Sequence, residues 1–351
     1  MTALASDRPF LSDFHEVRVR EGKRSGLTVA IAIHRTVDGR SLGGCRFEPY
    51  TSADDAILDV KRLARAMTFK AAIAGLELGG GKGVIAAMPD CAPDAYHRRL
   101  ALRDFAELVE SFDGQYITAQ DAGTSEEDIS YMSRFTDHVS GRPRAEGGAG
   151  DPSPYTAHGI DVAIRASLRG ELEGRHVIVL GLGHVGSTLA RRLHNAGAQL
   201  SVSDVDPGKR DFAEQLGARW LEPHQAMSAE ADVFAPCALG GVLDHQTIAK
   251  LRVSVVAGAA NNQLATDSAA DALRKRGIVW APDFVANAGG LIAVSDELHG
   301  FDEQRVERAI ERIGETLEEI YARAAAAGTN TLIAAQELAA ERSGGLDDDD
   351  H

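Results

Sequence analysis

The segment His176-Val-Ile-Val-Leu-Gly-Leu-Gly-His-Val-Gly-Ser-Thr-Leu-Ala190 places three glycines between an apolar run and a helical pattern. The apolar run predicts a buried strand, and the helix continues to about Ala196. G-x-G-x-x-G alone is weak evidence, but here a second strand follows and ends at Asp204, which completes the dinucleotide-binding fingerprint. We expect the pyrophosphate to lie on the glycine turn and the helix N-terminus, on Gly181, Leu182, Gly183, His184, Val185 and Gly186.

Asp204 stands 204 − 181 = 23 positions after the first glycine, near the spacing of a carboxylate that binds the adenosine ribose. Val205 and Asp206 follow, with no arginine directly after the strand. A ribose phosphate would therefore meet two carboxylates, and the pattern favours NAD over NADP.

On the C-terminal side, strands are predicted at 233–235, 253–257 and 278–281, alternating with helical stretches. This is typical of a Rossmann-type doubly wound domain, assigned to residues 150–300. We expect 301–324 to be a connecting helix, helices at about 325–343 to complete the first domain, and the acidic tail 344–351 to be disordered or partly non-native. A boundary is predicted in 140–154, which is rich in Gly and Pro.

Residues 1–140 predict a separate α/β domain. Strands are expected at 16–19, 27–33, 45–47, 83–87 and 116–119, with helices from about 51 to 67, from 93 to 111 and after Ser125.

Two lysines, Lys70 and Lys82, lie in this part in an apolar, glycine-rich run, 67–85. Desolvation and a neighbouring ammonium would lower the pKa of Lys82 and make it a base. Gly79–Gly81 would let a ligand or another backbone approach the amine. The alternative is a glycine-rich turn between strands with a solvated lysine after it.

Asp121 follows the strand at 116–119, where ligand sites gather in α/β domains. A turn or capping role is the alternative for this carboxylate.

Composition excludes several classes of function. The net charge of −15 over 351 residues argues against nucleic acid or an anionic membrane as a partner. The N-terminus lacks a signal-peptide pattern and no apolar run is long enough to span a bilayer, so we expect a cytoplasmic protein. Three scattered cysteines and twelve histidines show no disulfide or metal-ligand spacing, and no metal is expected.

Several motifs occur in one order along the chain. They are Leu42-Gly-Gly-Cys-Arg46, Met67-Thr-Phe-Lys70, Gly75-Leu-Glu-Leu-Gly-Gly-Gly-Lys82, Gln120-Asp-Ala-Gly-Thr124, Asp151-Pro-Ser-Pro-Tyr-Thr-Ala-His-Gly159, Ala235-Pro-Cys-Ala-Leu-Gly240, Ala259-Ala-Asn-Asn-Gln-Leu264 and Ala281-Pro-Asp-Phe-Val-Ala-Asn-Ala-Gly-Gly290. From about Phe14 to Ala339 the chain resembles the leucine/phenylalanine/valine dehydrogenase family, a branch of the glutamate dehydrogenase superfamily.

The resemblance implies NAD-dependent, reversible oxidative deamination of an L-amino acid to its 2-oxo acid and ammonia. Lys70 matches the lysine that holds the substrate carboxylate, Lys82 the lysine that activates water, and Asp121 the carboxylate that exchanges protons with the substrate nitrogen. It also implies a homo-oligomer assembled through the first domain.

By the same resemblance, Ser153 and Thr156 lie near the nicotinamide, and Ala238 and Leu239 border the cofactor. Asn262 reaches substrate or ribose, although Asn261 is not excluded. The side-chain pocket maps onto Leu42, Gly43, Met67, Leu291 and Val294.

These pocket residues are apolar or small, so an apolar substrate of the Leu, Val, Ile or Phe type is expected and glutamate is disfavoured. The choice among apolar side chains and the number of subunits stay open.

The chain departs from the commonest family pattern at three positions next to the catalytic groups, where Phe69, Gln120 and Gly83 replace a frequent Tyr, Glu and small Thr, Ser or Ala. None of these departures removes a catalytic group. They support one alternative function, and a different class of protein supplies a second. One is a specialised amino acid dehydrogenase that serves a biosynthetic pathway with an unusual substrate, and the other is a non-catalytic NAD-binding regulator.

Overall fold

The computed structural model describes residues 14–87 and 94–344, and within them the chain divides into two compact units. The first comprises the chain up to Asp151, together with Val294–Phe301 and the residues from Arg342 onward. The second comprises Pro152–Ala293 and Asp302–Glu341. The expected tail at 344–351 lies almost wholly outside the described residues.

This division differs from the expected one in the last quarter of the chain. The expected connecting helix at 301–324 is part of α12, whose apolar face, including Val306, Ile310 and Leu317, is buried within the second unit. Up to Glu341, the helices assigned by sequence to the first domain also group with the second unit. An amphipathic period predicts that a helix packs on something, but it does not identify the partner.

The first unit is built on a five-stranded sheet of order β1-β2-β4-β3-β5, with β1 and β2 antiparallel to their neighbours and β3 parallel to β4 and β5. Its elements are β1 (Glu16–Glu21), β2 (Thr28–Ile33), β3 (Ser41–Pro49), α1 (Ala53–Ile73), β4 (Gly79–Ala87), α2 (Ala95–Glu110), β5 (Tyr116–Gln120) and α3 (Glu126–Met132).

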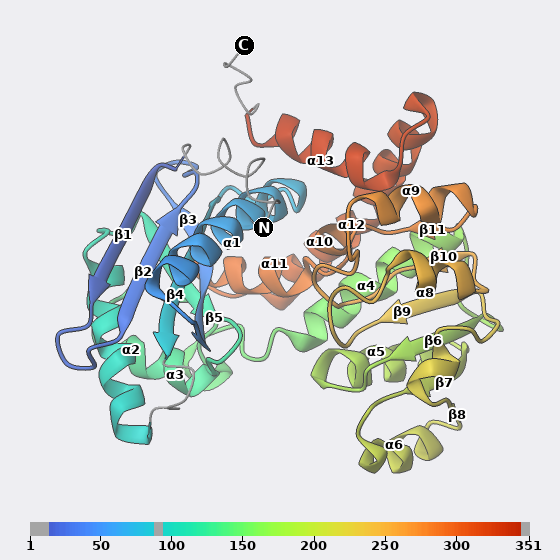
Figure 1. Cartoon of the computed structure of the whole chain (residues 1–351), viewed down its shortest axis with the longest axis horizontal. Coiled ribbons are helices and arrows are strands. Elements are labelled where there is room, and N and C mark those ends of the chain that lie inside the picture. Colours follow the sequence, from blue (N-terminus) through green and yellow to red (C-terminus); the bar gives the residue numbers. More distant parts are fainter. Residues whose placement is uncertain (1–13, 88–93, 345–351) are drawn as a thin grey trace. The chain divides into compact units, whose positions relative to one another are not determined.

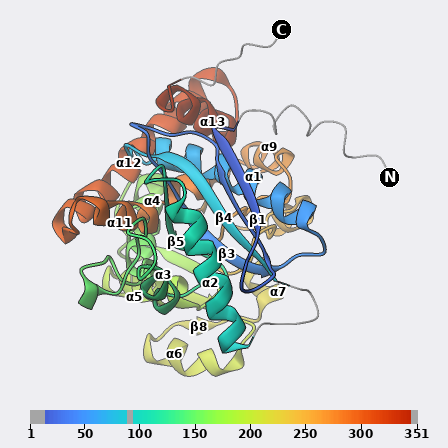
Figure 2. The ribbon, with the colours of Figure 1, turned by 90° about the vertical axis from the view of Figure 1, so that its left-hand side faces the viewer.

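Helices cover both faces of this sheet (Figures 1 and 2). On one face, Val60 and Ala64 of α1 pack against small residues of β2 and Val84 of β4. On the other face, α2 packs through residues such as Phe105 against Ile31, Cys45 and other strand residues. Because side chains alternate along a strand, Lys82 shares the α1 face with Val84.

Helix α1 is longer than the sequence pattern indicated. It was expected to end at Met67, but it continues to Ile73 and stops before Gly75, which has φ +69°. No helix breaker stands between Met67 and Gly75, so the helix can continue. Lys70 therefore lies in the last turn of α1 and not in the connection after it.

The glycine run 79–81 belongs to strand β4, not to a turn before it. A Cβ on Gly80 would lie 2.0 Å from the backbone nitrogen of Thr68 in α1, and one on Gly79 would lie 1.9 Å from the Arg35 carbonyl oxygen. At Gly79 and Gly80 the close approach that we expected of a ligand or another backbone is made by another backbone, and Gly80 lets α1 pack directly on β4.

The second unit contains a six-stranded parallel sheet of order β11-β10-β9-β6-β7-β8. Its elements are α4 (Ser153–Leu168), β6 (His176–Leu180), α5 (His184–Asn195), β7 (Gln199–Ser203), α6 (Arg210–Gln215), β8 (Arg219–Trp220), α7 (Pro223–Ala226), β9 (Val233–Pro236), α8 (His245–Lys250), β10 (Val255–Val256), α9 (Ser268–Lys275), β11 (Val279–Trp280), α10 (Asp283–Ala286), α11 (Gly289–Asp296), α12 (Glu303–Ala327) and α13 (Thr331–Arg342). Helix α11 begins in this unit and ends in the first, and only Arg342 of α13 belongs to the first.

The expected Rossmann-type order is therefore present, with β6 central and the chain winding outward in both directions. Ligands of such sheets bind at the carboxyl ends of the strands, where the order reverses. None of the helices in the described part of the chain combines the length and apolarity needed to cross a bilayer.

Candidate active site

Lys82 and Asp121 form an ion pair in the first unit, with Lys82 Nζ 3.0 Å from Asp121 Oδ2. The Lys82 side chain, in the middle of β4, is 6% exposed, and that of Asp121, just after β5, is 26% exposed. The two groups that the sequence singled out for proton transfer are thus in direct contact. Their carboxylate and amine can pass a proton between them without rearrangement.

Arg46 of β3 is a further member of this site, to which the sequence analysis gave no role. Its Nε lies 3.0 Å from Asp121 Oδ2, and its Nη1 lies 3.1 Å from Asp59 Oδ2 of α1. Tyr50 donates a hydrogen bond of 2.6 Å to the same Asp59 oxygen. A charged residue between Cys45 and Phe47 in the predicted strand was the available signal for Arg46.

These contacts set the protonation of Asp121. Burial alone would raise the pKa of its carboxyl, but the Lys82 ammonium and the Arg46 guanidinium outweigh burial and hold that pKa below its usual value. Asp121 is therefore ionised and ready to accept a proton at neutral pH. The alternative of a turn residue holds for its backbone, since the Asp121 N–H donates to Thr124 Oγ1.

Two glycines of β3 allow the close approach that this site requires. A Cβ on Gly43 would lie 1.7 Å from the Gly81 carbonyl oxygen, and one on Gly44 would lie 2.7 Å from the Asp121 Cβ. Leu42, buried at 2% exposure, is paired in register with Gly80. The structure thus brings Leu42 and Gly43 beside the part of β4 that precedes Lys82, and Gly44 beside Asp121.

Lys70 lies in the last turn of α1 and is half-buried. Thr68, two residues before it, packs on Gly80 of β4, but residues two apart on a helix face different directions, so this contact does not place the Lys70 side chain. Met67 is half-buried on α1. The structure places the Asp121 carboxylate in contact with Lys82, and the expected influence of the Lys70 ammonium on Lys82 stays a prediction.

One departure from the family pattern has a packing reason. A Cβ on Gly83 would lie 2.2 Å from Phe105 Cζ of α2, so this phenylalanine occupies the space of a larger residue. Gly83 points to the α2 face, away from the Lys82 side chain.

The remaining pocket residues are divided between the units. Val294 is 6% exposed and belongs to the first unit, where its carbonyl accepts a 2.6 Å hydrogen bond from Ser140. Leu291 is half-buried in the second unit.

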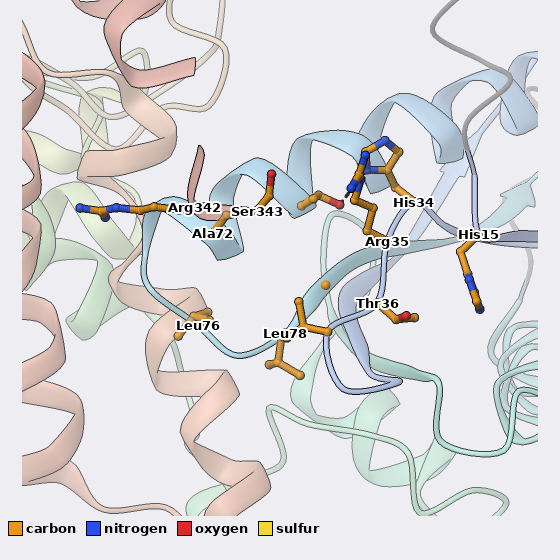
Figure 3. A pocket seen from close by; sticks show the side chains of 12 residues that line it. His15, His34, Arg35, Thr36, Ala72, Leu76, Leu78, Arg342 and Ser343 are labelled. Carbon is orange, nitrogen blue, oxygen red and sulfur yellow. Dashed lines mark hydrogen bonds between the residues drawn. The ribbon is translucent and has the colours of Figure 1, made fainter. Parts of the chain in front are cut away.

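A cavity of about 270 Å³ in the first unit is a different feature from this site. Figure 3 shows it between the end of α1 and the connection to β4, with Leu76 and Leu78 on one side and His34 and Arg35 on the other. Lys70, Lys82 and Asp121 are not among its lining residues. We therefore place the candidate catalytic groups outside it.

In the second unit, the fingerprint glycines have the geometry that a dinucleotide requires. Gly181 has φ +101°, and a Cβ on Gly186 would lie 1.9 Å from the Gly181 carbonyl oxygen. A Cβ on Gly183 would meet nothing within 4 Å, and this residue caps α5 without a side-chain hydrogen bond. The residues present thus fit a pyrophosphate on the amides at the start of α5, including His184 and Val185.

The adenosine end has matching features. Asp204 follows β7, and its carboxylate accepts hydrogen bonds from Leu182 N at 2.6 Å and Asp206 N at 2.8 Å. Val205 and Leu239 are unusual among large apolar residues because 89% and 82% of their surface is exposed. Exposed apolar side chains at the carboxyl ends of β7 and β9 offer an apolar surface on which the flat adenine base of a dinucleotide can pack.

The loops after β9 and β10 lie together at the same edge. A Cβ on Gly181 would lie 2.7 Å from the Ala238 Cβ, and Gly241 N–H donates to the Asn262 carbonyl at 2.7 Å. Asn262 is exposed with φ +52°, whereas Asn261 accepts a hydrogen bond of 2.8 Å from Asn287. Both asparagines are exposed, so both stay candidates for a ligand contact.

Two buried polar atoms near this edge lack hydrogen-bond partners within the described residues, Ser203 Oγ and Asn287 Oδ1. Such orphaned atoms are rare and fit a bound polar ligand. At the start of α4, Ser153 is buried, and a Cβ on Gly290 would lie 2.6 Å from Thr156 Oγ1. The residues that we predicted to lie near the nicotinamide are thus next to the start of α11.

Comparisons with known proteins agree with this arrangement. The family described as "Glu/Leu/Phe/Val dehydrogenase, dimerisation domain" matches residues 12–138, and "Glutamate/Leucine/Phenylalanine/Valine dehydrogenase" matches residues 209–343. A "D-isomer specific 2-hydroxyacid dehydrogenase, NAD binding domain" matches residues 159–252.

Similar proteins match over nearly the whole chain. Leucine dehydrogenase of Geobacillus stearothermophilus is 41% identical, over 94% of this chain and 90% of that protein. Phenylalanine dehydrogenase of Bacillus thermotolerans is 38% identical, over 95% and 89%. The crystal structure of L-tryptophan dehydrogenase from Nostoc punctiforme superimposes with a TM-score of 0.83 at 36% identity, over 96% of this chain and 97% of that one.

Proposed function

The chain belongs to the Glu/Leu/Phe/Val dehydrogenase family, and we propose that it catalyses the reversible, NAD-dependent oxidative deamination of an apolar L-amino acid to its 2-oxo acid and ammonia. The observation that carries the proposal is the Lys82–Asp121 ion pair at the glycine-lined end of β3. This pair provides the acid–base chemistry that deamination needs.

Binding begins with the substrate carboxylate, which Lys70 holds as a point charge. Ionised Asp121 takes a proton from the substrate ammonium, so that the nitrogen lone pair can assist hydride departure from Cα. A nicotinamide cofactor, held by the residues described above, would supply the hydride acceptor when bound. The substrate is left as an iminium ion, which water attacks.

The ion pair lies between the water that loses a proton and the amine that gains one. Lys82, which must first release its own proton to solvent, takes a proton from the attacking water, and Asp121 gives the proton that it took from the substrate to the nitrogen that departs. Because Lys82 Nζ and Asp121 Oδ2 are 3.0 Å apart, the pair can carry the proton from the water to the amine. The hydroxyl proton of the adduct leaves with ammonia as ammonium when the carbonyl forms. The products are thus the 2-oxo acid, ammonium and the one proton that Lys82 released to solvent, and the pair returns to its starting charge.

Support for NAD comes from Asp204 and Asp206 after β7, which would repel a ribose 2′-phosphate. Initial rates with NAD and NADP at equal concentration test this choice. We expect NAD to be preferred at least about tenfold, and equal rates would contradict the assignment.

Support for an apolar substrate comes from Leu42, Met67, Leu291 and Val294, none of which can pair with a charged side chain. Incubation with NAD and a panel containing Leu, Val, Ile, Phe, Trp and Glu should give NADH with at least one apolar amino acid and little with Glu. The reverse panel uses 2-oxo acids, ammonia and NADH, and would reveal a specialised substrate.

Replacement of the base tests the mechanism. Lys82→Ala should lower turnover at least about 1,000-fold, because no other group can accept the water proton, while NADH affinity stays within about twofold. The control is Lys23→Ala, since Lys23 is exposed. NADH binding without turnover of any amino acid by the wild type would instead favour the regulator. Loss of NADH binding in Lys82→Ala would show that the lysine serves the cofactor.

We also propose that the protein is a cytoplasmic homo-oligomer. The first family match, over residues 12–138, is described as a dimerisation domain, which supports assembly through the first unit. Light scattering on the purified protein measures the number of subunits, and a mass of one chain would contradict the proposal.

A further inference from the structure

A second cavity, of about 360 Å³, lies in the second unit beside the edge strand β11. The ends of α4, α9 and α12 line it, together with Thr329–Thr331. Figure 1 shows α9, β11 and α12 close together in that unit. None of its lining residues belongs to the sets proposed above for cofactor or substrate.

The cavity walls are apolar and partly aromatic. Leu273, Ile278 and Trp280 are at most 5% exposed, and Ala324 and Tyr321 of α12 also line the cavity. The volume suits a ligand of small-molecule size. These walls would therefore bind the apolar part of a ligand.

One polar atom in this wall is unsatisfied. Thr329 Oγ1 is buried and has no hydrogen-bond partner within the described residues. The neighbouring hydroxyls are occupied, since Tyr321 and Ser167 bond each other at 2.6 Å and Thr331 donates to the Trp280 carbonyl at 2.9 Å. A buried, unpaired hydroxyl costs free energy unless a ligand or water completes it.

Two exposed arginines also line the cavity. Arg169 caps α4 and has no ion pair or side-chain hydrogen bond within the described part of the chain. In α9, the Nε atom of Arg274 lies 4.0 Å from Asp271 Oδ1, which is a long ion pair. The same Asp271 oxygen accepts a 2.9 Å hydrogen bond from Asn330. Both guanidiniums offset the negative ends of their helices and still retain donors for a carboxylate.

We propose that this cavity is a second ligand site, separate from the active site, for a small organic carboxylate with an apolar body. The carboxylate lies on Arg169 and Arg274, the body lies against Trp280 and Leu273, and Thr329 Oγ1 hydrogen-bonds a polar atom of the ligand. The site does not depend on the activity proposed above.

Calorimetric titration of the full chain, saturated with NADH, tests the proposal. Benzoate is the probe, and benzamide is its neutral counterpart. Benzoate should bind more tightly, and Arg274→Gln should weaken its binding about tenfold because a charged hydrogen bond is lost. Lys275→Gln, a change at an exposed neighbour outside the cavity, should leave benzoate binding unchanged.

A second pair of variants fills the cavity without touching its charges. Ala325 and Ala326 are both exposed on α12, but only Ala325 lines the cavity. Ala325→Leu should abolish benzoate binding, whereas Ala326→Leu should not. Benzoate binding that survives Ala325→Leu but is lost in Lys70→Met would place benzoate in the active site and overturn the proposal, as would no binding at all.

Thr329→Val separates a ligand contact from a structural role. It replaces the unpaired hydroxyl with a methyl group of similar size, so thermal stability should be unchanged or higher. Benzoate affinity should fall severalfold. A loss of stability with unchanged affinity would show that the hydroxyl serves the fold and would remove it from the site.

Discussion

Asp121 Oδ2 receives two cations, Lys82 and Arg46, from two different strands. Both favour the ionised carboxylate, and together they exceed the effect of burial. Arg46 is itself fixed by Asp59 of α1, and burial, which would lower the Arg46 pKa, is outweighed by Asp121 and Asp59. Lys82 and Arg46 together thus keep the proton acceptor charged in a partly buried position.

Arg46→Gln should therefore raise the pKa of Asp121. Because Asp121 must be ionised to accept the substrate proton, the acid limb of the kcat/KM profile should move to higher pH, by about one unit. The profile of Arg40→Gln, a change in the turn before β3, should match that of the wild type. An unmoved acid limb in Arg46→Gln would show that Lys82 alone sets the charge of Asp121.

At the scale of elements, a close contact joins α1, which carries Lys70, to β4, which carries Lys82. The backbone of Thr68 approaches Gly80 so closely that no side chain fits between them. His34 at the end of β2 reinforces this contact, since its Nδ1 lies 2.9 Å from Thr68 Oγ1. Lys70 and Lys82 follow this contact by two residues on their own elements.

Gly80→Ala should force α1 away from β4. The added Cβ would meet backbone at 2.0 Å, which cannot rotate away, and we expect a loss of about 2 kcal/mol or more in the free energy of unfolding. Turnover should fall more than cofactor affinity, because the lysines are displaced. Chemical denaturation and kinetics measure both effects. Gly170→Ala is the control, since a Cβ there meets nothing within 4 Å.

On the scale of the whole molecule, each unit has its own core. A destabilising substitution in one unit should therefore leave the other unit folded. Asp104 of α2 is a suitable probe in the first unit. Its carboxylate accepts hydrogen bonds of 2.8–3.0 Å from the backbone and side chains of Arg24 and Ser25, in the turn between β1 and β2. Burial would raise the pKa of Asp104, but these donors hold it below its usual value.

Asp104→Ala should lower the free energy of unfolding by about 2 to 4 kcal/mol at pH 7. The pKa of Asp104 is lower in the folded chain, so its stabilisation is complete above about pH 4 and is lost as pH falls through the folded value. The difference between variant and wild type should shrink in acid. NADH affinity at pH 7 should stay within about twofold, and a large fall would show that the two units unfold together.

Much of the site could be predicted from the sequence, because certain residue types at short spacing indicate a particular reactive or binding group. The turn of Gly181, Gly183 and Gly186 is local, and the structure gives each glycine its expected geometry. Lys82 and Asp121 were identified by their setting and by resemblance. Their direct contact was not foreseen, since it joins residues on separate strands.

The sequence by itself determined the kinds and order of the elements, the dinucleotide turn and the candidate reactive groups, because propensity, periodicity and turn chemistry act over a few neighbouring residues. Only the tertiary structure decided which surfaces those residues meet. It placed Gly79–Gly81 inside a strand against α1, made Arg46 the partner of Asp121, and grouped α12 with the second unit. These outcomes depend on packing and charge between residues far apart in the chain, and no local pattern encodes them.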